Sequence, residues 1–298
     1  IVPIIIVAVL LVIVIAALIL IGKNGKNKDT SADPVATEQS GTTEEETQNT
    51  EVMGAIEAAE STEETDADDP QGSSMGNETG ASVDVTALLS AGSVAESGET
   101  TFGIDVARYQ GTIDWSQVAA SGVQFAMIRV GYRTQKTGEI VADTNAKYNM
   151  QEAQANGIKI GAYFFSTAVT TDEAVQEADW VADYISQYQI TYPVAFNCEG
   201  FENADSRQYA MTQSERTDMA IAFLNEIYNR GYTPMFYAAK NEMLGDAKWD
   251  TSRIEKTYKI WVSQYPSVPY PQTAQSDYTG THAMWQYTNQ GTVAGISK

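Results

Sequence analysis

The sequence predicts an α/β fold, in which parallel strands and covering helices form a TIM-like barrel over residues 101–298. Apolar runs rich in β-branched and aromatic residues alternate there with segments that begin at helix-capping residues and end near glycine. Parallel strands need helical crossovers of this kind. The apolar runs recur seven times within about 200 residues, which favours a closed barrel over an open sheet. Two of the runs end in a carboxylate, as expected where a barrel carries catalytic residues to the C-terminal ends of its strands.

The expected elements follow one another in a regular order. Thr212 and Glu215 form a capping box, the signature of a helix start. We expect the eighth strand of the barrel to follow Lys298, and we interpret the chain as truncated at both ends. The expected helices cover 113–118, 145–155, 170–187 and 212–231. The expected strands are Phe102–Val106, Phe125–Val130, Ile158–Phe165, Pro193–Glu199, Pro234–Ala238, Lys259–Val262 and Ala283–Tyr287.

The first segment, Ile1–Gly22, is an almost unbroken apolar run. At about 1.5 Å per residue it is long enough to cross a hydrocarbon core of about 30 Å. A cleaved signal peptide is the competing interpretation, but it would need a shorter apolar core and a small-residue cleavage site. The residues that follow, 22–26, make a poor cleavage site. We therefore expect an uncleaved transmembrane anchor.

The next segment, residues 23–100, has the composition of a disordered acidic linker. From Asp29 to Thr100 it contains 18 Asp and Glu and no Lys, Arg or His, with Ser, Thr, Ala and Gly filling most of the rest. Such a segment buries too little apolar surface to offset the entropy of ordering. One short apolar run, Val83–Leu89, could form a transient helix or dock, but we expect no structure there. A tether of about 70 residues suits a domain that works at a distance from a membrane.

The remaining charge and the rare residue types exclude several classes of function. Residues 101–298 hold 21 of the 39 acids and 15 of the 18 bases, so they carry −6 of the net charge of −21. A mildly acidic domain argues against nucleic acid as a partner. The single cysteine, Cys198, excludes an intrachain disulfide framework. Neither Cys198 nor the single histidine, His282, offers a cluster of metal ligands, so we expect no metal and no cofactor.

The two strand-end acids, Glu199 and Asp105, are the candidate catalytic residues. Glu199 follows the apolar run 193–198, and partial desolvation there would raise its pKa, as suits a general acid near neutral pH. Two acids on strand ends, with aromatic residues around them, suggest cleavage of a glycosidic bond. Each acid also has a purely structural interpretation. Glu199 could belong to an ion pair of the barrel, and Asp105 could cap a turn.

Several motifs in order resemble glycoside hydrolase family 25, the Chalaropsis-type lysozymes or N-acetylmuramidases. These enzymes cut peptidoglycan between N-acetylmuramic acid and N-acetylglucosamine. The resemblance covers nearly all of Phe102–Ile296 in the family's order. The matching segments are 102–111 (FGIDVARYQG), 125–132 (FAMIRVGY), 161–166 (GAYFFS), 177–179 (EAD), 260–265 (IWVSQY) and 285–288 (WQYT).

The resemblance implies an irregular β/α barrel with its active site at the C-terminal ends of the strands. It places Glu199 at the family's proton donor and Asp105 at an active-site Asp of the first strand. It also implies a sugar groove, although each aromatic residue of the groove could instead belong to the core. The residues implied for this groove are Tyr163, Tyr237, Trp261 and Gln286.

The chain departs from the family's pattern in two places. The usual Asp-x-Glu reads Asn197-Cys198-Glu199 here, and the family's late Val-Asp pair would fall past Lys298. An Asn cannot act as nucleophile or general base, so a mechanism with a carboxylate at position 197 is excluded. One route survives, in which the substrate's own 2-acetamido group attacks the anomeric carbon while Asn197 and Asp105 position it. An Asn-x-Glu pair resembles that of certain endo-β-N-acetylglucosaminidases that work in this way.

The leading hypothesis is therefore a membrane-anchored peptidoglycan hydrolase. It would be a monomer with a single membrane span and an extracellular C-terminal domain, acting on peptidoglycan glycan strands. A second hypothesis is a catalytically impaired domain that binds cell-wall glycan without cutting it, because losing a carboxylate costs catalysis more than binding. A third hypothesis keeps the enzyme but makes it an endo-β-N-acetylglucosaminidase.

Overall fold

The structure of the protein is a computed structural model that describes residues 68–71, 79–90 and 100–298. All of these residues belong to one compact unit, Ser61–Lys298. The predicted membrane anchor, Ile1–Gly22, and most of the predicted linker lie outside the described residues. Within the described part of the chain, no helix is both long and apolar enough to cross a membrane.

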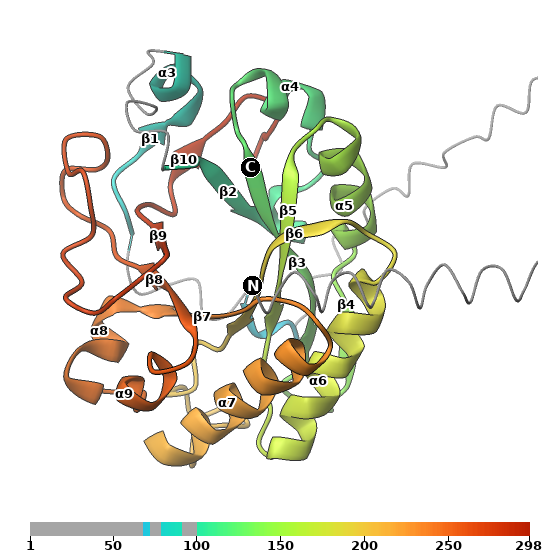
Figure 1. Ribbon diagram of the computed structural model, residues 1–298, viewed down its shortest axis with the longest axis vertical. Coiled ribbons are helices and arrows are strands. Elements are labelled where there is room, and N and C mark those ends of the chain that lie inside the picture. Colours follow the sequence, from blue (N-terminus) through green and yellow to red (C-terminus); the bar gives the residue numbers. More distant parts are fainter. Residues whose placement is uncertain (1–67, 72–78, 91–99) are drawn as a thin grey trace, which may run out of the picture. The chain divides into compact units, whose positions relative to one another are not determined.

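The centre of the unit is a curled β-sheet whose strands follow the chain order (Figure 1). Neighbouring strands on this path are all parallel, and a short strand, β4 (Ile140–Ala142), adds to β3 in the antiparallel direction. The predicted strands are confirmed as β2 (Gly103–Val106), β3 (Phe125–Arg133), β5 (Lys159–Phe165), β6 (Ile190–Asn197), β7 (Pro234–Ala239), β8 (Lys259–Ser263) and β9 (Met284–Gln286).

The sheet is a half-barrel rather than the closed barrel that the number of strands favours. Among the described residues, its two edge strands, β2 and β9, do not pair with each other. Both are short, four and three residues, which leaves little backbone to continue the hydrogen-bond ladder. The predicted α/β class is therefore confirmed, whereas closure, which is expected to need an eighth strand after Lys298, stays a prediction.

Helices cover the outer face of the sheet, and their starts follow the predicted caps. The Asp114 side chain accepts hydrogen bonds from the backbone N–H groups of Ser116 and Gln117 at the start of α4. Thr212 and Glu215 form the predicted capping box at the start of α7. Two of the helices, α6 and α7, lie side by side along the sheet (Figure 1). The longer helices are α4 (Trp115–Ala120), α5 (Ala146–Ala155), α6 (Thr171–Ile185) and α7 (Gln213–Asn229). The short ones are η1 (Arg108–Gln110), α8 (Lys240–Met243), η2 (Leu244–Asp246) and α9 (Thr251–Ile254).

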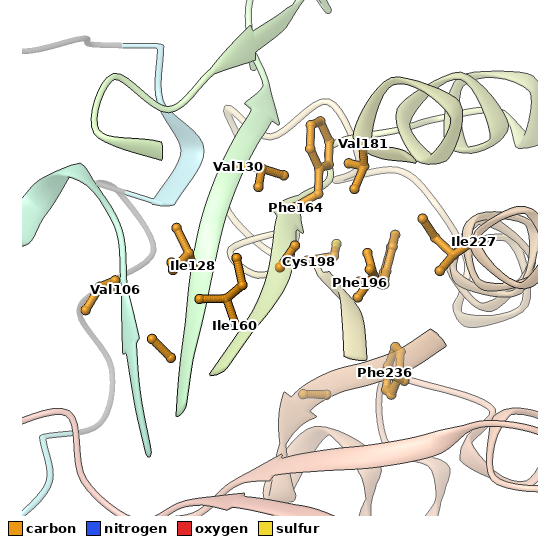
Figure 2. Packing of buried hydrophobic residues seen from close by; sticks show 14 of the residues in the cluster. Val106, Ile128, Val130, Ile160, Phe164, Val181, Phe196, Cys198, Ile227 and Phe236 are labelled. Atoms are coloured by element: carbon orange, nitrogen blue, oxygen red, sulfur yellow. The ribbon is translucent and has the colours of Figure 1, made fainter. Parts of the chain in front are cut away.

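The strands are buried on both faces, which explains their continuous apolar sequences. Phe164 and Phe196 lie in the larger core between sheet and helices, and Figure 2 shows them near Val181 and Ile227 of the helices. Burying one such aromatic side chain contributes about 1.5–3 kcal/mol to stability. Alternate positions of the same strands form a second, smaller cluster inside the half-barrel. That inner cluster consists of Phe125, Met127, Tyr163, Ala195, Met235, Tyr237 and Trp261.

The prediction that Val83–Leu89 has no structure is wrong. β1 (Val83–Asp84) pairs in parallel with β10 (Gly291–Thr292), and α3 (Val85–Ser90) follows it at once. Val83 and Val85 are both buried, and Asp84 accepts a hydrogen bond from the backbone of α3. Five apolar residues in a short run are enough to dock here because a partner strand is available. The average composition of the acidic segment conceals this local pattern.

Candidate active site

The predicted site residues come from six strands of the half-barrel and gather at one end of it. Parallel strands present their C-terminal ends at a common edge, where loops and strand-end side chains meet. The structure thus brings together residues that are up to 181 positions apart in the chain. They are Asp105 (β2), Tyr163 (β5), Asn197 and the following Glu199 (β6), Tyr237 (β7), Trp261 (β8) and Gln286 (β9).

A hydrogen-bond network centred on Gln286 joins the two edges of the sheet. Its amide Nε2 donates to both carboxylate oxygens of Asp105, at 3.0 Å each. Its Oε1 accepts hydrogen bonds from the hydroxyls of Tyr237 (2.9 Å) and Tyr265 (2.7 Å). Because both tyrosines donate to the oxygen, the amide nitrogen must face Asp105. The network therefore fixes the position of the Asp105 carboxylate across the opening between β2 and β9.

The two carboxyl groups of the site are both shifted toward the protonated form. Burial raises the pKa of Asp105, and the hydrogen bond from Gln286 opposes this shift. Burial also raises the pKa of Glu199 to about 7, assisted by the charges of Glu242 and Asp105. A hydrogen bond from the Asn197 amide lowers the pKa of Glu199 and so limits the shift. A carboxyl group with a pKa near 7 can both donate and accept a proton at neutral pH.

Asn197 is the polar residue closest in sequence to Glu199, and its side chain is only partly satisfied. It ends β6 and is 4% exposed. Its Oδ1 atom is buried and has no hydrogen-bond partner among the described residues. Leaving a buried acceptor unpaired costs about 1–3 kcal/mol. A ligand that brings an N–H group to this oxygen would recover that free energy.

Three aromatic residues predicted to line the groove pack against one another. The ring centroids of Tyr237 and Trp261 are 4.7 Å apart, and those of Tyr163 and Trp261 are 6.4 Å apart, both in edge-on arrangements. Their side chains are at most 8% exposed. They form the inner wall of the site, so little ring face is open to a sugar. Beside this wall a cavity of about 500 Å³ reaches Asp105, Trp261 and Gln286.

Comparison with known proteins decides the family. The model of the family described as glycosyl hydrolases family 25 matches residues 104–296, more than half of the chain. The chain belongs to this family. The match begins one residue before Asp105 and includes every predicted site residue.

One curated protein and two solved structures give the range of similarity. The chain is 26% identical over 206 residues to the uncharacterized protein YegX of Escherichia coli strain K12, with 66% of each chain covered. It therefore spans slightly less than two thirds of that relative. The fold is similar to the modular autolysin LytC of Streptococcus pneumoniae, with a TM-score of 0.53 and 21% identity, over 65% of this chain and 44% of LytC. LytC has also been solved in complex with a synthetic peptidoglycan ligand. A bacterial lysozyme of Streptomyces coelicolor matches with a TM-score of 0.50 and 22% identity, over 66% of this chain and 88% of that one. At these identities the two structures support the fold alone.

Two residues of the family 25 domain were not predicted for the site, although they take part in its electrostatics and hydrogen bonding. Glu242 lies in α8, directly after β7, and its Oε2 accepts a hydrogen bond of 3.2 Å from the Trp249 indole. Burial raises the pKa of Glu242 to about 7. Tyr265, two residues after β8, donates to Gln286. Both follow predicted strands closely, and this strand-end position is the signal that could have found them.

The site shows no arrangement suited to a metal ion. Within residues 68–71, 79–90 and 100–298, no group of three or more His, Cys, Asp and Glu side chains could hold one. Cys198 is buried and free, with its Sγ 3.0 Å from Gln208 Oε1. Burial raises the pKa of Cys198 well above its ordinary value, so its thiol stays protonated.

Proposed function

We propose that the protein is a peptidoglycan hydrolase that cleaves the β-1,4 bond between N-acetylmuramic acid and N-acetylglucosamine. The observation that carries the proposal is the pairing of Glu199, whose pKa is raised to about 7, with Asn197, whose buried amide oxygen has no partner. Membership of family 25 supports a glycosidic substrate. LytC, a protein of similar fold, has been solved in complex with a synthetic peptidoglycan ligand, which supports peptidoglycan as the class of substrate.

The first chemical step uses the substrate's acetamido group as the nucleophile. Glu199 donates its proton to the leaving glycosidic oxygen while the acetamido oxygen forms a bond to the anomeric carbon. Asn197 Oδ1 accepts the acetamido N–H, which orients the group and supports the positive charge that develops on it. This bond supplies the partner that Asn197 lacks in the structure. Asp105, held in place by Gln286, presents its carboxyl oxygens to the same charge.

The second step releases the product. The Glu199 carboxylate takes a proton from a water molecule, whose oxygen bonds to the anomeric carbon as the acetamido oxygen leaves. Glu199 ends the cycle protonated, as it began. Acid and base roles at one residue are most efficient when the pKa lies near the working pH, which is the value that burial gives here. Because each step inverts the anomeric carbon, the proposed product retains the β configuration.

We propose further that the enzyme is anchored to the cell membrane by Ile1–Gly22, with the hydrolase domain outside the cell as a monomer. The apolar composition of that segment and the acidic composition of the region after it support this arrangement. Both lie mainly outside the described residues. Fusion of a reporter enzyme after Lys298 tests the orientation, since a reporter active only outside the cell should then be active.

The test of function is analysis of the sugar at the new reducing end after the purified chain is incubated with peptidoglycan. New muramic-acid reducing ends, absent with Glu199→Gln, are the expected result. Glu255→Gln, the same change at an exposed residue of the domain, is the matched control and should behave as the unchanged protein. New glucosamine reducing ends would identify an endo-β-N-acetylglucosaminidase instead. Retained glycan binding without any product would identify a binding domain.

A further inference from the structure

A second charged centre lies on β3, beside the candidate active site. Arg129 is fully buried, and its Nε donates to Asp143 Oδ2 at 2.7 Å. The guanidinium also lies 5.1 Å from the ring centre of Tyr109 and 5.0 Å from that of Tyr132. One ion pair and two aromatic neighbours thus hold the guanidinium in a defined orientation.

The outer edge of this guanidinium binds a carboxylate from a distant part of the chain. Arg129 Nη1 and Nη2 donate to the two oxygens of Asp69, at 2.9 and 2.7 Å. Arg108 Nε forms a further ion pair of 3.0 Å with Asp69 Oδ2. The bidentate arrangement is the strongest that arginine forms with a carboxylate. Asp69 itself is only 4% exposed, so the pair is well shielded from water.

Asp69 belongs to the short segment 68–71, which the acidic composition predicts to be unstructured. The backbone N–H of Lys136 donates to the Asp68 carboxylate at 2.7 Å, which attaches the segment to the loop after β3. Gln71 accepts a hydrogen bond of 2.8 Å from Arg129 and donates one of 3.3 Å to the Tyr163 hydroxyl. The segment therefore reaches the aromatic wall of the candidate active site.

Asp69 supplies part of the negative charge that faces the arginines of this centre. Among the described residues, the ion pairs join Arg129 to Asp143 and Asp69, and Arg108 to Asp69. Withdrawal of the segment would leave Nη1 and Nη2 of a buried arginine without the carboxylate that they bind. A buried unpaired charge is costly, so the vacated position favours another carboxylate. Peptidoglycan carries such groups, on the lactyl ether of muramic acid and on its stem peptides, whereas a polymer of N-acetylglucosamine carries none.

We propose that Arg129 and Arg108 form a carboxylate-binding subsite of the glycan cleft, and that Asp69 occupies it as an internal competitor of the substrate. This inference rests on the proposed function for the identity of the substrate. The subsite would distinguish muramic-acid glycans from uncharged glycans. The segment 68–71 would restrain the enzyme until the substrate displaces it. An internal competitor raises the apparent KM and leaves kcat unchanged, because saturating substrate displaces it.

The competitor is tested by Asp69→Asn in the full chain, with kinetics on soluble peptidoglycan fragments. The substitution keeps the shape of the side chain and removes its charge, so the segment should release the subsite. The expected result is a KM that falls by about fivefold or more, with kcat unchanged. Asp84→Asn, the same change at the end of β1, is the control and should leave KM unchanged. An unchanged or higher KM for Asp69→Asn would overturn the proposal.

The subsite is tested by binding, so that the result does not depend on turnover. Calorimetry on Asp69→Asn with Glu199→Gln would compare three probes: a peptide-free muramic-acid oligosaccharide, its stem-peptide form and a chitin oligosaccharide. Adding Arg108→Gln, a half-buried position that should not endanger folding, is expected to weaken the carboxylate-bearing probes about tenfold and to leave chitin binding unchanged. Weaker binding of the peptide-free probe alone would identify the lactyl carboxylate as the bound group. Weaker binding of the stem-peptide form alone would identify a carboxylate of the stem peptide. Equal effects on all three probes would overturn the proposal. The expected binding pattern in a chain that releases no muramic-acid reducing ends would refute the proposed function alone.

Discussion

The β6 side and the β3 side of the barrel mouth both bury charged or polar groups, but they satisfy them differently. On β6, Asn197 has an unpaired amide oxygen and the pKa of Glu199 is raised to about 7. On β3, Arg129 is paired on both edges, by Asp143 and by Asp69. Catalytic groups gain from being unsatisfied until the substrate arrives, whereas recognition groups that are charged need a partner at all times. The difference indicates that the β6 side carries out the reaction, whereas the β3 side binds a charged group.

Removing the carboxyl group on the β6 side should have the largest effect. Glu199→Gln keeps the size of the side chain and removes the proton that the leaving oxygen needs. We expect kcat to fall by about 10³-fold or more. Rates of reducing-end release measure this, and circular dichroism checks that the fold is retained. A loss of less than about tenfold would show that another group supplies the proton.

Breaking the pair on the β3 side should act on stability. Asp143→Asn removes the charge that faces Arg129 Nε inside the protein. We expect the free energy of unfolding to fall by about 3 kcal/mol, the usual cost of leaving one partner of a buried pair. Asp179→Asn, which breaks an exposed pair with Arg230, is the control and should cost less than about 1 kcal/mol. Urea unfolding curves would compare the two variants. Equal losses of unfolding free energy would contradict the view that the pair of Arg129 with Asp143 is a buried ion pair.

The amide of Asn197 should matter for catalysis more than for folding. Asn197→Ala removes the acceptor proposed for the acetamido N–H, and we expect kcat to fall by about 100-fold. Asn197→Asp retains an acceptor oxygen at the same place, so it should keep more activity than the Ala variant. Parallel kcat measurements on the two variants provide the test. Equal activities of Ala and Asp would remove Asn197 from the mechanism.

The smallest effect on activity should come from a shift of the pKa of Glu199, which changes the pH dependence of kcat/KM. Because Glu199 must be protonated to act, kcat/KM should fall as the pH rises through its pKa of about 7. Glu242→Gln removes a charge that raises this pKa, so the descending limb should move to lower pH. A limb that stays in place would show that Glu242 does not act on Glu199.

Three buried carboxyl groups should make stability depend on pH: those of Glu199, Glu242 and Glu177, the last of which lies in α6 and pairs with Arg133. The pKa values of Glu177, Glu199 and Glu242 are each raised to about 7, above the ordinary value of 4.5. The folded protein therefore holds protons that the unfolded chain releases. This stabilisation is fully present below pH 4.5 and is lost as the pH rises toward 7. Unfolding curves recorded across that range should show the loss, and it should be smaller in Glu199→Gln.

The sequence predicted the features that local patterns determine. Each strand was visible because it is buried on both faces and has a continuous apolar sequence, and the acids at strand ends followed from the parallel direction of the sheet. Gln286 was predicted as a groove residue from the family resemblance. Its position between Asp105 and two tyrosines depends on contacts across the whole chain.

The structure of the segments 68–71 and 83–89 could not be predicted, because it too depends on contacts with distant parts of the chain. Asp69 lies among many acids, and nothing in its neighbourhood distinguishes it from Asp68 or Glu64. Its role depends on Arg129, which is 60 residues away and has its own partner in Asp143. Val83–Leu89 likewise docks only because β10 offers an edge, more than 200 residues later. The composition of a segment describes that segment alone, whereas each of these contacts depends on a second segment far away in the sequence.

The most direct test of the central claim, that the substrate's acetamido group is the nucleophile oriented by Asn197, uses modified substrates. Muramic-acid oligosaccharides with N-acetyl, N-fluoroacetyl and N-difluoroacetyl groups would be cleaved by the unchanged protein, and kcat would be compared. Fluorine withdraws electrons from the acetamido oxygen and weakens it as a nucleophile. The account predicts that kcat falls steeply with each fluorine. Equal kcat values across the series would contradict it and require a nucleophile from the protein.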